Sequence, residues 1–174
     1  MAAATKTTTA QRGFFSFPNP VNEVSARLVA GGVVLLSAIA LATGWTWLVV
    51  AIAYGFVARA LAGPRLSPLS QFATRVIMPR TGLAPRPVPG PPKRFAQAIG
   101  AAITVPAAVL AVLGDRTEVD VLLVLIIAAA VLESVFAICV GCRIFALLMR
   151  AGVIPESVCE SCNDIRGARP GRPS

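Results

Sequence analysis

The sequence predicts an all-α integral membrane protein in which four transmembrane helices form two hairpins. Hydrophobic residues make up 56% of the 174-residue chain and charged residues only 14%, whereas soluble domains have about 25% charged residues. The apolar residues also gather into four runs, each close to the ~20 residues that cross a bilayer core. Ala, Val, Leu and Gly dominate these runs, which favours helices packed through small side chains.

The four apolar runs come in two pairs, at 28–42 with 45–61 and at 95–113 with 121–140. Thr43-Gly44 separates the first two runs, so a tight helical hairpin is expected there. The first two runs are also the shortest, which leaves a re-entrant hairpin as their alternative. Pro106 predicts a kink in the third run, and the acidic segment around Asp115 joins it to the fourth.

The basic residues indicate the orientation in the membrane. The segment 59–94 carries arginines and a lysine but no acid, and both terminal segments are basic. The connection between the third and fourth runs is acidic. The positive-inside rule therefore predicts a multi-pass protein of the inner (plasma) membrane with both termini in the cytoplasm. Contact with the lipid bilayer explains the net charge of +8, so we expect no nucleic-acid partner.

The segment between the two hairpins predicts one short amphipathic helix, over residues 67–78. Ser67 is a suitable N-cap and Pro68 a suitable first residue. This helix lies either on the membrane surface or against protein as an ordinary loop helix. The proline-rich stretch 85–92 predicts an extended connector.

These features divide the chain into four parts. Residues 14–151 form the four-helix membrane domain, and residues 152–165 form a C-terminal cysteine segment. The polar ends, 1–13 and 166–174, are expected to be disordered tails. Residues 1–25 contain no apolar h-region, so no cleavable signal peptide is expected.

All four cysteines occur in two CxxC pairs, Cys139 with Cys142 and Cys159 with Cys162. The spacing C-x2-C-x16-C-x2-C is that of a four-thiolate metal site, with Zn²⁺ as the first candidate. If the fourth membrane helix continues to about Arg150, the first two thiols share one face of it. A return segment after that helix would then bring the second pair level with the first.

Two glycines near the first cysteine pair also have expected structural roles. Gly141, between the two cysteines, would let another backbone approach closely. Gly152 is a suitable C-cap for the helix that carries this pair, and Pro155 follows it.

Three interpretations of the cysteines remain open. They bind a structural metal ion; they form a redox or sulfur-relay site, in which one pair exchanges with the other or with a partner; or they are incidental small residues. A cytoplasmic location disfavours stable disulfides, and the absence of histidine removes the usual general base. Arg143 would lower the thiol pKa of Cys142. The C-terminus of a membrane helix, however, carries partial negative charge and does not stabilise a thiolate.

Glu133 is the one acid inside an apolar run, and such a residue usually has a partner or a role. We expect an interhelical ion pair with Arg27, and a proton or substrate site is the alternative. On a continuous helix Glu133 would point away from Cys139 and Cys142.

Four segments resemble a bacterial membrane family, domain of unknown function 4395. They are Phe-Pro-Asn-Pro-Val-Asn-Glu-x3-Arg at 17–27, Gly-Pro-Pro-Lys-Arg-Phe-Ala-Gln at 90–97, and Cys-Val-Gly-Cys-Arg-Ile-Phe-Ala-Leu-Leu-Met-Arg at 139–150 with Cys-Glu-Ser-Cys at 159–162. The resemblance covers roughly residues 14–165. It implies an association with thioredoxin-like proteins and rhodanese-type sulfurtransferases, and it assigns no catalytic residue beyond the four cysteines.

The expected function is that of a membrane anchor or partner in thiol-redox or sulfur-transfer chemistry, through a cytoplasmic-side cluster of the four cysteines. The alternatives are a structural or scaffold protein whose cysteines bind zinc, and a small-solute transporter that uses Glu133. The sequence leaves open whether the chain is an enzyme, which substrate it serves, and whether it forms a homo-oligomer.

Overall fold

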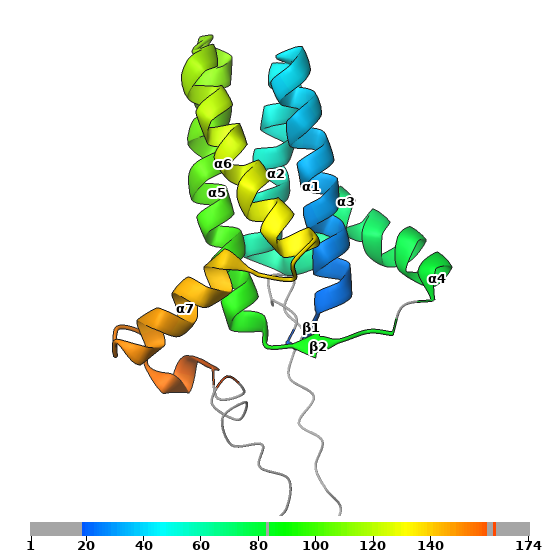
Figure 1. Cartoon of the computed structure of the whole chain (residues 1–174), viewed down its shortest axis with the longest axis vertical. Helices are drawn as coiled ribbons and strands as arrows, with labels where there is room; N and C mark the ends of the chain where they lie inside the picture. Colours follow the sequence, from blue (N-terminus) through cyan, green and yellow to red (C-terminus); the bar gives the residue numbers. More distant parts are fainter. Residues whose placement is uncertain (1–18, 83, 160–161, 163–174) are drawn as a thin grey trace, which may run out of the picture.

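The computed structural model describes residues 19–82, 84–159 and 162. Two helical hairpins stand side by side in it (Figure 1). Helices α1 (Glu23–Thr43) and α2 (Thr46–Ala62) form the first hairpin, and α5 (Gly90–Leu113) and α6 (Arg116–Ser134) form the second. The two tails expected to be disordered, 1–13 and 166–174, lie outside the described residues.

The hairpins pack against each other through α2 on α5 and α1 on α6. One buried cluster lies near the tips of the hairpins and includes Leu48, Ile52 and Leu123. Small residues allow the close approach: a Cβ atom on Gly100 would lie 2.3 Å from the ring of Phe56. The expectation that small side chains pack these helices holds at this contact.

Among the described residues, three helices are long and apolar enough to cross a membrane, Glu23–Thr43, Thr46–Arg65 and Gly90–Leu113. The second of these spans includes the 3-10 turn η1 (Gly63–Arg65) after α2. Helix α6 runs alongside them (Figure 1) but carries charged residues in its first turns and Glu133 near its end.

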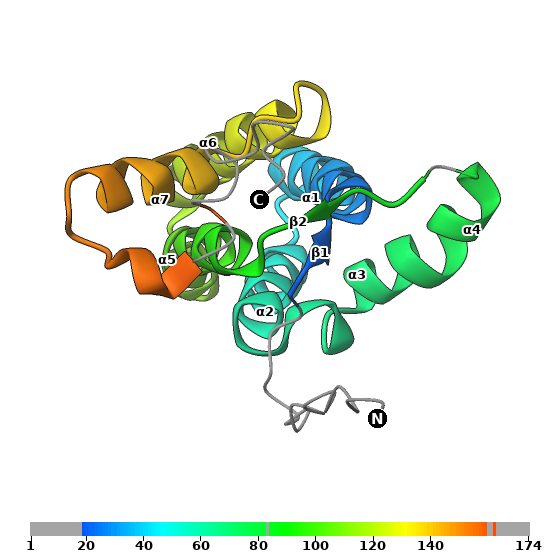
Figure 2. The same ribbon diagram turned by 90° about the horizontal axis from the view of Figure 1, so that it is seen from below.

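The amphipathic helix predicted over 67–78 is present and extends further. It consists of α3 (Pro68–Phe72), the π-helical turn η2 (Ala73–Ile77) and α4 (Met78–Thr81), and it projects sideways from one end of the bundle (Figures 1 and 2). Leu69 packs against the bundle core, whereas Phe72 is 54% exposed. This helix therefore contacts protein on one side and keeps an apolar residue free on another.

The proline-rich connector is extended and pairs with the N-terminal entry, which the all-α prediction did not include. Strands β1 (Val21–Asn22) and β2 (Pro87–Val88) are antiparallel, with Val21 opposite Val88. The side-chain oxygen of Asn22 accepts hydrogen bonds from the backbone N–H groups of Val24 (3.0 Å) and Arg86 (3.2 Å). The Asn19 side chain accepts another from the N–H of Gly90, at 3.1 Å. These bonds tie the start of α1 to the start of α5.

The prediction of one continuous helix from the fourth apolar run to Arg150 was wrong. Helix α6 ends at Ser134, and a separate helix α7 (Val140–Arg150) leaves the bundle, as Figure 1 shows. The guanidinium of Arg27 donates hydrogen bonds to the carbonyl of Ser134 at 3.2 and 3.0 Å and to that of Val135 at 3.3 Å. A side chain of α1 thus satisfies the last carbonyls of α6, which would otherwise favour continuing the helix.

The chain turns back after α7, as expected. Gly152 follows the helix with a φ of 74°, the left-handed conformation that suits glycine. The 3-10 turn η3 (Glu156–Cys159) then contacts α5.

Candidate thiol–disulfide site

Cys139 and Cys142 begin helix α7. Cys139 is its N-cap residue, and Cys142 lies three residues further on, in the first turn. Both thiols are free and partly buried. The unpaired N–H groups and the dipole at a helix N-terminus favour an anion such as a thiolate. The expectation that the thiols lie at the unfavourable end of a helix is therefore wrong, because α7 is a separate helix.

Gly141 sets the distance between α7 and α5. A Cβ atom on Gly141 would lie 2.5 Å from both Cα and Cβ of Ala96, so only glycine allows this approach. One turn further along α7, the ring of Phe145 packs edge-on against Phe95, with 5.5 Å between the ring centres. These contacts hold both cysteines against α5. The sequence predicted that another backbone could approach closely at Gly141.

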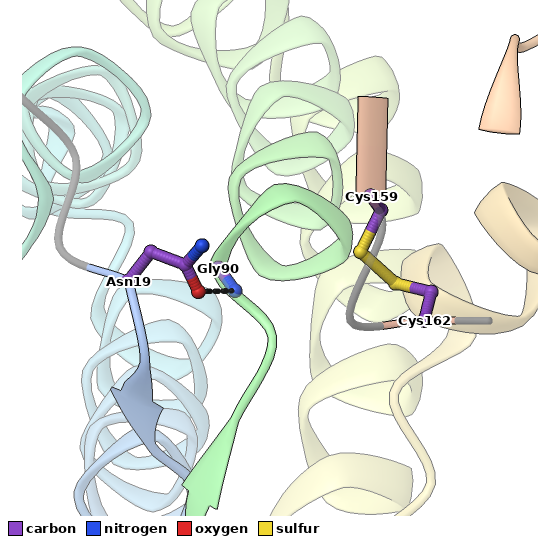
Figure 3. The surroundings of a disulfide bond; sticks show 4 residues. All are labelled: Asn19, Gly90, Cys159 and Cys162. Atoms are coloured by element: carbon purple, nitrogen blue, oxygen red, sulfur yellow. Dashed lines mark hydrogen bonds between the residues drawn. A yellow bond between two sulfur atoms is a disulfide. The ribbon is translucent and has the colours of Figure 1, made fainter. Parts of the chain in front are cut away.

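The two cysteine pairs meet at one cavity of about 490 Å³, called the polar cavity below. Its walls include Cys139, Cys142 and Cys162. Cys162 is joined to Cys159 by a disulfide bond, which Figure 3 shows beside the start of α5. The expectation of four free thiols is therefore wrong for the second pair. A dithiol and a disulfide face the same space.

A buried ion pair lies next to the thiols. The ammonium of Lys93, on the first turn of α5, is 2.6 Å from a carboxylate oxygen of Glu133 on α6, and the two side chains are 10% and 16% exposed. Lys93 also lines the polar cavity. The site thus combines two thiols with one cation and one anion from the two neighbouring helices.

The two thiols differ in acidity. A hydrogen bond from the Cys142 thiol lowers the pKa of Cys139 below its ordinary value, against burial and the charge of Glu133, and the charge of Lys93 adds to the lowering. The same hydrogen bond, with burial, raises the pKa of Cys142. Cys139 is therefore the sulfur with more thiolate character, and the thiolate is the nucleophile.

The sequence matches the family described as Domain of unknown function (DUF4395) over residues 21–150. The protein belongs to the DUF4395 family. The matched span contains Lys93, Glu133, Cys139 and Cys142 but ends before Cys159 and Cys162, so the resemblance noted from the second pair lies outside it. Comparison with curated proteins and with solved structures finds no match.

Glu133 has a different partner from the one predicted. Within the described residues of this DUF4395 protein, it pairs with Lys93, and Arg27 is used to cap α6. The prediction that Glu133 points away from the cysteines was also wrong, because the chain turns after Ser134 and Glu133 comes to share a second cavity with Cys139. The sequence does not single out Lys93, because it lies among the other cations of the segment 59–94.

A four-thiolate metal site does not fit this state of the chain. Such a site needs four deprotonated sulfurs around one centre, and the sulfurs of Cys159 and Cys162 are bonded to each other. The described residues contain no group of three or more histidine, cysteine, aspartate or glutamate side chains that could hold a metal ion. Metal binding by the four cysteines would first require reduction of this disulfide.

The arrangement has the parts that thiol–disulfide exchange needs. These are a thiol whose pKa is lowered, a second thiol beside it to resolve a mixed disulfide, and a disulfide on the same cavity wall. Nothing in the sequence around 139–142 reveals the break before α7, which places the first of these thiols at a helix start.

Proposed function

We propose that this DUF4395 protein is a membrane-embedded partner in thiol-redox chemistry, in which the Cys139–Cys142 pair exchanges with the Cys159–Cys162 pair. The shared polar cavity is the observation that carries the proposal, because it brings three of the four sulfurs to one space in opposite oxidation states. Cytosolic disulfides are usually transient and catalytic, which suits a pair that is oxidised and reduced in turn.

The exchange proceeds in two displacement steps. The Cys139 thiolate attacks Cys162, the Cys159–Cys162 bond breaks, and Cys159 leaves as a thiolate. Cys142 then gives its proton to the Cys159 thiolate and attacks Cys139, and the Cys139–Cys162 bond breaks so that Cys162 leaves as a thiolate. The result is a Cys139–Cys142 disulfide and a reduced second pair, and each step is reversible.

Removal of the resolving thiol tests the exchange. In Cys142→Ser, Cys139 can attack, but the mixed disulfide cannot go forward and can only revert through the freed Cys159 thiol. Alkylation of Cys159 during the reaction blocks this return, so a Cys139–Cys162 bond should accumulate. After trypsin digestion without reductant it should link peptides 117–143 and 151–166, which mass spectrometry identifies. Cys139→Ser is the matched control and should give far less of a linkage between these peptides. Absence of the link in Cys142→Ser, with Cys139 still open to alkylation, would argue against exchange.

The membrane topology belongs to the same proposal. We infer that α6 is the fourth span and that both termini and the cysteines lie on the cytoplasmic side. The support is the pairing of Glu133 with Lys93, which lowers the cost of placing that acid in a membrane, and the cations in 59–94. Reporter fusions after Gly63 and at the C-terminus should read cytoplasmic, and a fusion near Arg116 should read external.

The partner is proposed to be a cytoplasmic thioredoxin-like or rhodanese-type protein, on the family resemblance. The two classes leave different products. A thioredoxin-like partner changes only the thiol–disulfide state of Cys159 and Cys162. A rhodanese-type partner adds one sulfur atom, and the persulfide on Cys139 or Cys162 is visible as added mass on the tryptic peptide.

A further inference from the structure

A second cavity, of about 270 Å³, lies inside the bundle on the other side of Cys139. Cys139 lines both this cavity and the polar cavity, whereas Cys142 lines only the polar one. The other walls of the second cavity come from all four bundle helices and from α7, and they are mostly apolar. They include Val33, Phe56, Ile103, Ile126 and Ala129. We call this space the apolar cavity.

Polar groups at one end of the apolar cavity come from Arg59, Gln97 and Glu133. Arg59 is only 6% exposed. Its guanidinium donates hydrogen bonds to Gln97 at 2.7 Å and to Ser67 at 3.2 Å, and it lies 4.5 Å from the centre of the Phe56 ring. The cavity therefore combines apolar and aromatic walls with a fixed cation, the pattern of a small-molecule site.

The rim of the apolar cavity faces outward through apolar side chains. Leu125 is 51% exposed, and Val140 and Ile144 are each 38% exposed, and all three line the cavity. In the proposed membrane orientation these side chains meet lipid, so a ligand would enter from the bilayer. Such a ligand must itself be lipophilic.

We propose that the apolar cavity binds a quinone-class lipid-soluble carrier that oxidises the Cys139–Cys142 dithiol. An apolar cavity of about 150 Å³ holds benzene, so this larger one has room for a substituted ring whose tail leaves through the rim. Arg59 offers a hydrogen-bond donor and a positive charge to a quinone oxygen, on which negative charge develops during reduction. The inference rests on the proposed thiol-redox function and adds its electron acceptor.

The reaction balances with these components alone. The two S–H bonds of Cys139 and Cys142 break and a disulfide forms between them. Two electrons and two protons pass to the quinone, which leaves as a quinol with two O–H groups. The new disulfide then oxidises a reduced Cys159–Cys162 pair by the reverse of the exchange above. In the structure the Cys139–Cys142 pair is reduced and the Cys159–Cys162 pair is oxidised. This is the state that precedes another oxidation by quinone.

The test uses the full chain, reduced, in lipid nanodiscs without oxygen. The probe is a decyl-chain ubiquinone analogue whose ring carbons are all substituted, so that thiols cannot add to the ring. We expect the quinone absorbance to fall as Cys139 and Cys142 become resistant to alkylation. Ala129→Phe should slow this reaction at least about tenfold, because a phenyl group fills the space that the ring needs. Ala128→Phe is the matched control, since Ala128 is the exposed neighbour on α6 and does not line the cavity.

A second substrate separates this inference from the proposed function. A water-soluble aromatic disulfide reaches the thiols through the polar cavity, so Ala129→Phe should leave its reduction unchanged. If the wild-type protein reduces this disulfide but not the quinone, the inference is overturned and the thiol-redox function stands. If it reduces neither, both fail. Equal slowing by Ala128→Phe and Ala129→Phe would show that the quinone does not react in the apolar cavity.

Discussion

The ammonium of Lys93 lies 2.6 Å from the carboxylate of Glu133, and this pair joins the start of α5 to the end of α6 beside the cysteines. Breaking a buried ion pair by removing one partner leaves an uncompensated charge, which costs about 3–5 kcal/mol. The pair therefore bears on stability and on the chemistry of the thiols at once.

The first prediction concerns the stability of this pair. Lys93→Gln and Glu133→Gln should each destabilise the protein in a thermal-shift assay. The double variant should cost less than the sum, with a coupling of about 0.5–3 kcal/mol. The cycle of Arg27→Gln with Glu133→Gln is the control and should show weaker coupling. Strict additivity for Lys93 and Glu133 would contradict the pairing.

The second prediction concerns the acidity of Cys139. Its thiol pKa is lowered by the Cys142 hydrogen bond and by Lys93, and it is raised by Glu133. Alkylation needs the thiolate, so the rate at Cys139 should rise with pH at a midpoint below the ordinary cysteine pKa of about 8.5. Removing the cation in Lys93→Gln should move the midpoint up, and removing the anion in Glu133→Gln should move it down.

Both cysteines lie on the tryptic peptide 117–143, so fragment-ion mass spectrometry of the alkylated protein, which assigns the label to one cysteine, measures the midpoint in each variant. The pKa of Cys142 is raised, so Cys142 should label more slowly than Cys139 at every pH below its own pKa. Equal labelling of the two cysteines would contradict the proposed division into attacking and resolving thiols.

The third prediction concerns the glycine between the cysteines. Gly141→Ala places a methyl group 2.5 Å from Ala96, so α7 must move away from α5. We expect overpacking to lower stability by about 1–3 kcal/mol and to raise the pKa of Cys139, because the charge of Lys93, which lowers that pKa, lies further from it. Gly31→Ala, where a Cβ meets nothing within 4 Å, is the matched control and should be neutral or stabilising. A fully stable Gly141→Ala variant would show that the close approach is not needed.

The fourth prediction concerns metal. The oxidised chain should hold no stoichiometric zinc, because two of its sulfurs are in a disulfide. Elemental analysis of protein purified without chelator, before and after reduction and incubation with Zn²⁺, measures this. Zinc that binds only after reduction and disappears in both Cys139→Ser and Cys159→Ser would favour the scaffold alternative over redox exchange.

The long apolar helices and the two hairpins could be predicted because they depend on local composition and on the short turns that join them. The amphipathic helix after Ser67 and the close approach at Gly141 also follow from local pattern. The break after Ser134 could not be predicted, since residues 135–138 contain neither glycine nor proline and the group that ends α6 is Arg27, on another helix.

The partner of Glu133 was missed for the same reason. Two cations, Arg27 and Lys93, lie at the start of helices that neighbour α6, and spacing along the chain does not distinguish them. The carbonyls of Ser134 and Val135 accept hydrogen bonds from Arg27, and Glu133 pairs with Lys93. Once the break is known, the position of Cys139 at a helix start follows directly.

The hydrogen bond from Gly90 to Asn19 bears on how a second domain could serve this site. Asn19 and Val158 line one surface hollow, on either side of the first turn of α5, and Figure 3 shows Asn19 in the same region as the disulfide. A soluble redox domain attached at Asn19 would therefore be held near Cys159 and Cys162, as would one attached at Cys162. Tethering at either position would raise the effective concentration of that domain at the disulfide, so gene fusions of both orders could support the same reaction.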